Sequence, residues 1–194
     1  MGRPKTYDRD EILARAMDCF WLKGYEGTST EDLVAGMGVN RYSLYAEFGS
    51  KQSLYEAALE RYNAEVVSGN FAALERPGAG LKEIKALFGF FASKARQPGS
   101  ERGCLLCNSA TERAPHDAAS FSFVEAYIER IAKAFRRALS NAKRDGDIGQ
   151  NVNASDEGYF LATVLLGFFV LLRSQADPKI IRRSARAVLR HLHA

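Results

Sequence analysis

The chain has 194 residues, of which 46% are hydrophobic and 26% are charged. The length predicts one or two domains, and a chain of this composition can bury a substantial core and need not be disordered. The net charge of +4 does not by itself indicate nucleic-acid binding, because residues 1–65 carry eight Lys or Arg against eleven Asp or Glu and the basic excess lies after them.

The N-terminus, the most apolar run and the cysteine content together predict a cytoplasmic protein. The N-terminal sequence MGRPKTYDRDEI is charged and has no apolar region of the kind that a signal peptide needs. The most apolar run, residues 158–172, is shorter than the ~20 residues that span a bilayer, so we expect a buried helix and no membrane partner. Three cysteines give no disulfide framework in a chain of this length, which favours a reducing compartment.

The first two helices are predicted by their N-terminal caps. Asp8 and Glu11 have the spacing of a capping box, so the first helix opens at Asp8, and Gly24 ends it. Thr28 and Glu31 repeat that spacing and predict the start of a short second helix, which ends in the glycine-containing sequence GMG.

Two further helices follow directly. Asn40 is a good N-cap and Gly49 a good terminator, so a third short helix is predicted between them. Ser50 then caps a fourth helix. After a Gly/Pro-rich connection at residues 75–80, apolar periodicity predicts five more helices, at residues 81–97, 103–113, 117–144, 155–175 and 178–193. The predicted fold class is all-α.

The sequence GVNRYSLYAEFGSK, residues 38–51, predicts a DNA-reading helix. Two short helices joined by a glycine-containing turn and braced by a first helix form a helix-turn-helix, whose second helix enters the major groove. Leu44 and Phe48 would anchor that helix to the core. The outward face would then present Arg41 and Tyr42 to base edges, the Ser43 and Tyr45 hydroxyls to phosphates, and the small Ala46 to a thymine methyl.

Lys51 follows in the first turn of the fourth helix, where free N–H groups already favour a phosphate. Periodicity alone leaves an alternative open, in which this is an ordinary turn between packed helices and its tyrosines merely cap the bundle.

Residues 10–55 resemble the DNA-binding domain of TetR-family transcriptional regulators. The matching segments are FWLKGYEGTSTEDLV, GMGV and SLYAEFGSKQSLY, while Tyr42 and the pair Ala46–Glu47 depart from the usual pattern. The resemblance implies a helix-turn-helix domain at residues 1–50, with an N-terminal arm at 1–7, and a larger helical bundle at 51–194 for ligand binding and dimerisation. It adds Thr28 to the residues expected to contact DNA.

The family resemblance implies a homodimeric, ligand-responsive repressor that binds a near-palindromic double-stranded operator. A small-molecule inducer would shift the fourth helix and move the two DNA-binding domains of the dimer out of register with the operator. The sequence GRPK before the first helix resembles minor-groove arms, in which Arg3 and Lys5 would contact DNA; a solvated tail is the alternative.

The segment RGCLLCNSATER raises the question of thiol chemistry. A metal site is disfavoured, because Cys104 and Cys107 have no second Cys/His pair. Both thiols could be apolar core residues. Alternatively, Cys104 lies near a helix N-terminus with Arg102 close by, which would lower its pKa below ~8.5, and a sensor thiol should be partly exposed. The sequence Gly-Cys-Leu resembles a subgroup of the family in which some members sense reactive species.

Two further residue sets follow from the family resemblance. The expected ligand-binding residues are Tyr62, Phe88, Phe91, Cys104, Cys107, Asn108, Phe123 and Tyr127. The expected dimer interface uses Phe160, Val164, Gly167, Phe168, Leu171, Val188 and Leu192, with Gly167 as the point of close helix approach.

Other classes of protein fit less well. No catalytic arrangement, phosphate-binding loop, cofactor motif or metal motif can be identified, so an enzyme is disfavoured. A lipid-binding or carrier protein without DNA binding remains the alternative, since it could use the apolar bundle and the arginine-rich face of residues 182–193.

Overall fold

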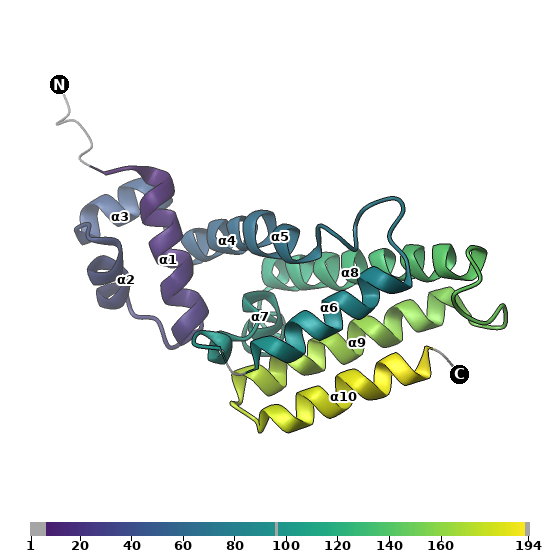
Figure 1. The fold of residues 1–194 in the computed structure, drawn as a ribbon. Helices are drawn as coiled ribbons and strands as arrows, with labels where there is room; N and C mark the ends of the chain where they lie inside the picture. Colours follow the sequence, from purple (N-terminus) through teal and green to yellow (C-terminus); the bar gives the residue numbers. More distant parts are fainter. Residues whose placement is uncertain (1–6, 96, 193–194) are drawn as a thin grey trace.

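The computed structural model describes residues 7–95 and 97–192, and the regular structure in this part of the chain is entirely helical (Figure 1). The predicted all-α fold is confirmed. The elements are α1 (Arg9–Lys23), α2 (Thr30–Met37), α3 (Arg41–Phe48), α4 (Lys51–Tyr62), η1 (Asn63–Val67), α5 (Ser68–Phe71), α6 (Leu81–Lys94), η2 (Ser100–Arg102), α7 (Leu105–Glu112), α8 (Ala118–Arg144), α9 (Ala154–Arg173) and α10 (Pro178–His191).

Helices α1 to α3 form a small head at one end of the molecule, and α6 to α10 form the body (Figure 1). The fourth helix, α4, packs against α1 of the head and against α7 and α8 of the body. The division into domains at residue 50 stays a prediction, because α4 belongs physically to both parts.

The second helix begins one residue later than predicted. Its N-cap is Ser29, which forms a capping box with Asp32 rather than Thr28 with Glu31. The Thr28 hydroxyl is unavailable as a cap because it donates to the Gly24 carbonyl at 2.5 Å and is fully buried. The predicted caps Asp8, Asn40 and Ser50 all accept backbone N–H bonds at the starts of α1, α3 and α4.

The fourth helix does not end at Tyr62 but continues through a π-helical segment, η1, into α5. In such a segment the backbone hydrogen bonds span five residues instead of four. The Ser68 hydroxyl donates to the Asn63 carbonyl at 3.0 Å. The Arg130 guanidinium of α8 connects the side chains around the segment, because it donates to the Asn63 side chain at 2.9 Å, to the Ser68 hydroxyl at 3.1 Å and to the Glu75 carboxylate at 2.8 Å.

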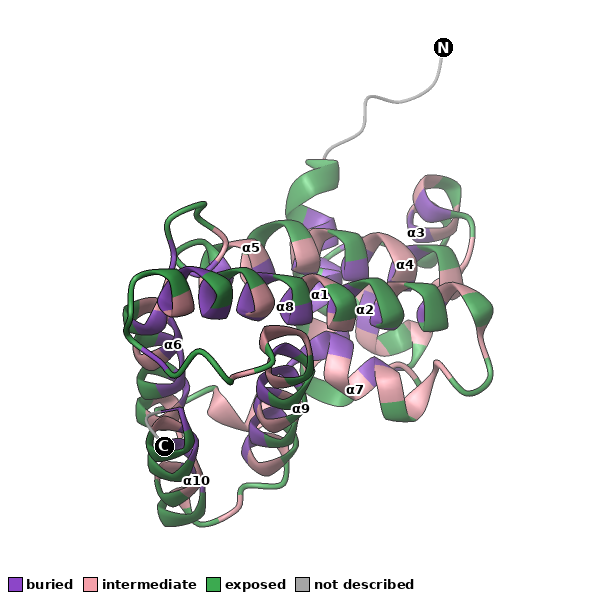
Figure 2. Cartoon of the chain, turned by 90° about the vertical axis from the view of Figure 1, so that its right-hand side faces the viewer, coloured by how far each residue is buried: buried purple, intermediate pink, exposed green. Residues whose placement is uncertain are grey.

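The core of the body is aromatic. Phe88 of α6 is fully buried, and its ring centroid lies 5.8 Å from that of Phe135 on α8 and 5.6 Å from that of Phe168 on α9. Figure 2 shows the buried residues of these helices on the faces turned toward one another and the exposed residues on the outside.

Helix α9 has 20 residues, which is longer than the apolar run suggested, and by length and composition it could cross a membrane. It packs against α8, and its Leu161, Leu165 and Phe168 are buried. We therefore interpret it as the central core helix of the body.

Helices α8 and α9 approach each other closely at Gly158. A Cβ added there would lie 2.9 Å from the Ala132 carbonyl oxygen and 3.1 Å from the Arg136 backbone nitrogen. Gly167, predicted as the point of close approach, has no atom within 4 Å of its added Cβ inside the protomer.

We therefore expect Gly158→Ala to lower the free energy of unfolding by about 1–3 kcal/mol, since backbone atoms cannot move aside as a flexible side chain would. The matched control is Gly89→Ala on α6, where an added Cβ meets nothing within 4 Å. That change should raise stability by about 0.5–1 kcal/mol, because alanine favours a helix over glycine. Denaturant unfolding measures both; equal effects would contradict the close contact.

Candidate nucleic-acid interface and buried cysteine cluster

The turn between α2 and α3 is fixed by two local features. Gly38 adopts a left-handed conformation (φ 70°, ψ 28°), and its N–H donates to the Val34 carbonyl at 3.0 Å. The Asn40 side chain then accepts the N–H of Ser43 at 2.8 Å and starts α3. Leu44 and Phe48 are buried, so one face of α3 is fixed to the head and the opposite face is presented outward.

The outward face of α3 carries the residues predicted to read bases. Tyr42 is 83% exposed, and Arg41 and Ala46 are also exposed. The guanidinium of Arg41 lies 3.6 Å from the Glu31 carboxylate and 5.7 Å from the ring centroid of Tyr45. This exposed ion pair is weak and would be exchanged readily for a contact with DNA.

The residues predicted to contact phosphates are more constrained. Tyr45 is half-buried, and its hydroxyl lies 3.1 Å from the Thr30 hydroxyl. Ser43 is half-buried at the start of α3. The ammonium of Lys51 lies 4.2 Å from the ring centroid of Tyr25, which holds the cation at the start of α4.

The prediction that Thr28 contacts DNA is wrong. Its side chain is fully buried and its hydroxyl is used inside the head. Arg3 and Lys5 of the predicted arm lie outside the described residues.

Glu47 has a structural role that the sequence did not indicate. Its side chain is 8% exposed, and its carboxylate lies 3.2 Å from the Arg9 guanidinium and 3.5 Å from the Tyr7 hydroxyl. Arg9 also lies over the Phe48 ring, 5.1 Å from its centroid. These contacts tie α3 to the start of α1. The only sequence clue was that Glu47 departs from the usual family pattern.

The end of α7 holds the head through one carboxylate. Glu112 accepts the N–H of Tyr25 at 3.1 Å and the N–H of Glu26 at 2.7 Å. Gly24 makes this approach possible, because it has a φ of 79° and an added Cβ would lie 2.7 Å from a Glu112 oxygen. Next to it, the Arg113 guanidinium lies over the Tyr25 ring, 4.2 Å from its centroid. We refer to the contacts of Glu112 and Arg113 with the head as the head–body latch.

Arg113 extends this latch, because it contacts both the turn after α1 and helix α4. Its guanidinium lies 3.2 Å from the Glu26 carboxylate and donates to the Gln52 side chain of α4 at 3.0 Å. Gln52 in turn donates to the Asp117 carboxylate at 3.1 Å. The head, α4 and the loop after α7 are therefore joined by one polar network.

Cys104 stands at the other end of α7, as its N-cap residue with an extended backbone. The side chain is 1% exposed, so it lacks the partial exposure expected of a sensor thiol, and a reagent would have to enter through the groove bordered by Cys107 and Tyr127. Its sulfur lies 3.3 Å from the Tyr127 hydroxyl. Burial by itself raises the pKa of this thiol, but hydrogen bonds to the sulfur from Cys107, Tyr127 and Tyr62 together lower the pKa to about 6.

The partners of Cys104 keep their protons. Burial, together with the negative charge of Cys104, raises the pKa of Tyr62 and that of Tyr127 well above the ordinary value. The hydrogen bond to Cys104 and burial likewise raise the pKa of Cys107. Arg102, expected to lower the Cys104 pKa, instead pairs with Asp18 at 2.7 Å. The thiolate is therefore favoured by neutral donors. We call Cys104, Cys107, Tyr62 and Tyr127 the cysteine cluster.

The residues predicted to line one ligand pocket are divided among several places. Tyr62 and Phe91 border a cavity of about 410 Å³, whereas Cys107 and Tyr127 border a separate groove of about 180 Å³. Phe88 is buried in the aromatic core. Two others have local roles: the Asn108 side chain donates to the Arg102 carbonyl at 3.0 Å, and Phe123 is half-buried on α8.

Three residues predicted at the dimer interface lie inside the protomer. Phe168, Val188 and Leu192 are at most 5% exposed, so they cannot face a partner. Within the chain, α10 packs against α6 and α9, and the Phe168 ring packs against that of Phe88 on α6. Phe160 and Gly167 are exposed, and Val164 and Leu171 are half-buried. Among the described residues no cluster of three or more His, Cys, Asp or Glu could hold a metal ion.

The chain matches two family models. Residues 12–58 match the model described as bacterial regulatory proteins, tetR family, and residues 80–188 match the tetracyclin repressor-like C-terminal domain. The first match contains α2 and α3 of the helix-turn-helix, and the second contains the cysteine cluster except for Tyr62.

Individual proteins agree with these matches. The chain is 32% identical to the uncharacterised HTH-type transcriptional regulator YezE of Bacillus subtilis over 91% of this chain and 92% of that protein. It is 29% identical to the HTH-type transcriptional repressor ComR of Escherichia coli over 97% of this chain and 90% of that protein. Its fold matches a cysteine mutant of the TetR-family regulator CifR in complex with 26-base-pair operator DNA, with a TM-score of 0.86, 29% identity and coverage of 98% of this chain and 100% of that chain.

We predict that Arg41→Ala and Tyr42→Ala each relax base discrimination at particular operator positions by about 1–3 kcal/mol, because their side chains are exposed on the outer face of α3. Lys51→Ala is the matched control. Loss of a phosphate contact should weaken binding to all sequences and reduce the slope of log K against log salt concentration by about 1. The measurement is the Kd for single-base variants of an operator selected from random DNA. A uniform loss for Arg41→Ala would assign its guanidinium to the backbone instead.

Proposed function

We propose that this chain, which belongs to the tetR family of bacterial regulatory proteins, represses transcription as a homodimer and leaves its operator when Cys104 is chemically modified. The observation that carries the proposal is the Cys104 sulfur, which is buried at the start of α7 and surrounded by hydrogen-bond donors that favour the thiolate.

Repression is supported by the exposed face of α3 and by the relatives. ComR is named a transcriptional repressor, and the CifR variant was solved on operator DNA. A dimer with two such heads would read successive major grooves, so the operator would be near-palindromic with half-sites about 34 Å apart or a multiple of that distance. Such a protein would act in the cytoplasm.

The outer face of α8 and α9 is the best candidate for the dimer interface. Tyr159 and Val170 are 45% and 56% exposed, and with the half-buried Leu166 they lie on one face of α9 by helical spacing; Phe121 of α8 is 53% exposed. Exposed aromatic and aliphatic side chains of this size on one helix face favour an interaction surface. Gly167 lies on the same helix with free space around it, which would admit a second helix.

Two reactions of the Cys104 thiolate would serve as the inducing event. With peroxide, the thiolate sulfur attacks one oxygen, the O–O bond breaks, and the products are a sulfenic acid and hydroxide. The Cys107 thiol then displaces the hydroxyl group from the oxidised sulfur, which forms a disulfide and releases water. With an α,β-unsaturated carbonyl compound, the thiolate adds to the β-carbon and the resulting enolate takes up a proton.

The extended backbone of Cys104 removes the geometric objection to a disulfide three residues apart. Within a regular helix the two side chains would be awkwardly placed. Cys104 precedes α7 and has an extended backbone, so this restriction does not apply to it, and Cys107 is among the groups that lower its pKa.

Modification would reach the head through α7. A group added at Cys104 enlarges a fully packed site, and the helix that begins there ends at the head–body latch. A shift of α7 would move Glu112 relative to the turn after α1. The fourth helix would take part as well, since Tyr62 at its end belongs to the cysteine cluster. A switch from 1:99 to 99:1 requires about 5.5 kcal/mol of differential stabilisation.

We expect peroxide or a quinone to release the wild-type protein from its operator, while Cys104→Ser stays bound. Cys107→Ser is the matched control: it should still respond to a quinone, but peroxide should leave a sulfenic acid rather than a disulfide. Band-shift assays measure release, and a sulfenic-acid reagent with mass spectrometry identifies the product. If the reagents release the wild-type protein and Cys104→Ser from the operator equally, the proposal is wrong.

The rate of alkylation supplies a pH test of the same site. A thiolate with a pKa of about 6 reacts fully at neutral pH and loses its reactivity only as the pH falls through about 6. Tyr127→Phe removes one donor, so the midpoint of the rate profile should move to higher pH. An unchanged midpoint would show that the hydroxyl does not stabilise the thiolate.

For the dimer, Val170→Asp should produce monomers, because an unpaired carboxylate would be buried at the centre of the proposed interface. Ala187→Asp on the exposed side of α10 is the control and should leave the dimer intact. Light scattering distinguishes the two masses. A dimer that survives Val170→Asp would exclude this part of α9 from the interface.

A further inference from the structure

A cavity of about 410 Å³ lies where the head meets the body, and we call it the junction cavity. It is bordered by Trp21 of α1, by residues of α4, η1, α5 and α6, by the turn at residues 98–103, and by α9. Its volume is within the range of small-molecule sites. It is separate from the groove beside Cys107.

The walls of the junction cavity are strongly aromatic. Trp21 and Tyr62 pack edge to face with ring centroids 4.9 Å apart, and Phe91 and Phe169 do the same at 4.9 Å. Two such ring pairs from four different elements form an apolar site of the kind that holds a planar aromatic group.

The charged groups around the junction cavity are all positive. Lys94 and Arg102 border it, and none of the described lining residues is acidic. The Arg102 charge is matched by Asp18 at 2.7 Å. The Lys94 ammonium lies 4.9 Å from the Phe90 ring centroid and has no carboxylate partner within the described ranges. Lys94 is therefore the cation that an anionic ligand would neutralise.

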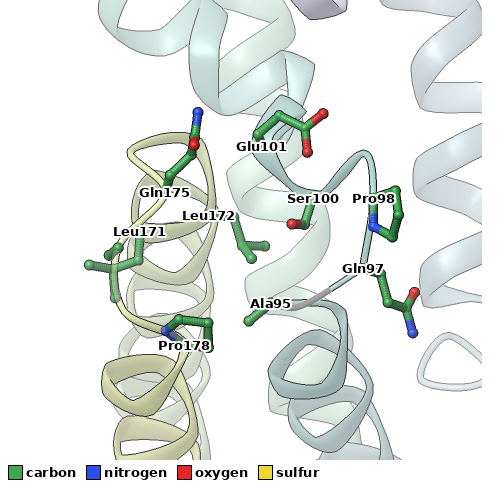
Figure 3. Close-up of a pocket in the computed structure, with 10 residues that line it drawn as sticks. Ala95, Gln97, Pro98, Ser100, Glu101, Leu171, Leu172, Gln175 and Pro178 are labelled. Atoms are coloured by element: carbon green, nitrogen blue, oxygen red, sulfur yellow. The ribbon is translucent and has the colours of Figure 1, made fainter.

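A neighbouring cavity is bordered by a negative charge instead of positive ones. It lies between the turn after α6 and the end of α9, with a volume of about 360 Å³ (Figure 3). Glu101 lies on its border, and its described lining residues include no lysine or arginine. An anion would be repelled there, so the charge distribution selects the junction cavity.

We infer that the junction cavity is a ligand site for an aromatic carboxylate, with the ring held by Trp21, Tyr62 and Phe91 and the carboxylate paired with Lys94. This site is distinct from the thiol and does not depend on covalent chemistry. A ligand there would touch α1 directly through Trp21 and the cysteine cluster through the ring of Tyr62. An effect of binding on operator affinity rests on the proposed function, but binding itself does not.

Trp21 is the only tryptophan in the chain, so tryptophan fluorescence comes from a residue that borders this cavity. We would titrate the protein with phenylbutyrate and with the neutral analogue phenylbutanol, which carry the same ring and chain. Phenylbutyrate should change the Trp21 emission with a Kd at least tenfold lower than that of phenylbutanol. Equal Kd values, or no response to either compound at millimolar concentration, would overturn the inference.

Lys94→Met keeps most of the side-chain length and should abolish the preference for the anion. Lys82→Met, on the exposed start of the same helix, should leave that preference unchanged. If Lys94→Met fails to fold, the wild-type Kd for phenylbutyrate should rise with salt while that for phenylbutanol does not; a salt-independent Kd would then overturn the inference.

Cys104→Ser separates this inference from the proposed function. Phenylbutyrate should still bind Cys104→Ser in preference to phenylbutanol, even though this variant should no longer respond to peroxide. If peroxide fails to release the wild-type protein from its operator, only the proposed thiol mechanism is contradicted. If phenylbutyrate fails to change the Trp21 fluorescence, only the inference about the junction cavity is contradicted.

Discussion

The Glu112 carboxylate is the contact through which α7 holds the head against the body. Glu112 accepts two backbone N–H groups from the turn after α1, at 2.7 and 3.1 Å, and charge-assisted bonds of this kind are stronger than those between neutral groups. The contact requires Gly24, because its positive φ shapes the turn and because a side chain would occupy the place of the carboxylate. A short rigid helix therefore fixes the position of the head against the body.

At the other end of that helix, the groups that lower the Cys104 pKa carry no charge. The Cys104 thiolate is favoured by the hydroxyls of Tyr62 and Tyr127 and by Cys107, all of which are neutral. The ionised cluster therefore carries a net negative charge inside the protein, whereas alkylation or disulfide formation removes that charge. Modification thus alters both the volume and the electrostatics of the site from which α7 starts, and a buried charge is costly unless every donor remains in place.

The features of the fold that depend on residues close together in the sequence could be predicted. The features that depend on contacts between residues far apart in the sequence could not. Caps, the turn at Gly38 and the anchoring of α3 by Leu44 and Phe48 follow from local rules. The choice of Ser29 over Thr28 as a cap depends on a bond from Thr28 to Gly24 that no spacing rule contains. Glu112 and Arg130 bind partners far away in the chain, so no pattern indicates them. Helix α9 is apolar on most sides, which is why periodicity could not separate Phe168, buried in the protomer, from Val170, exposed on its outer face.

The position of Tyr62 brings the two candidate sites into contact without merging them. Its ring forms part of the wall of the junction cavity, while its hydroxyl donates to the Cys104 sulfur. A ligand that fixes this ring would hold the hydroxyl in place and favour the thiolate; a modified Cys104 would lose that hydrogen bond and release the ring. By linkage, each event changes the free energy of the other by the same amount. Because Trp21 packs on Tyr62 and belongs to α1, this coupling extends to the head by a route separate from Glu112.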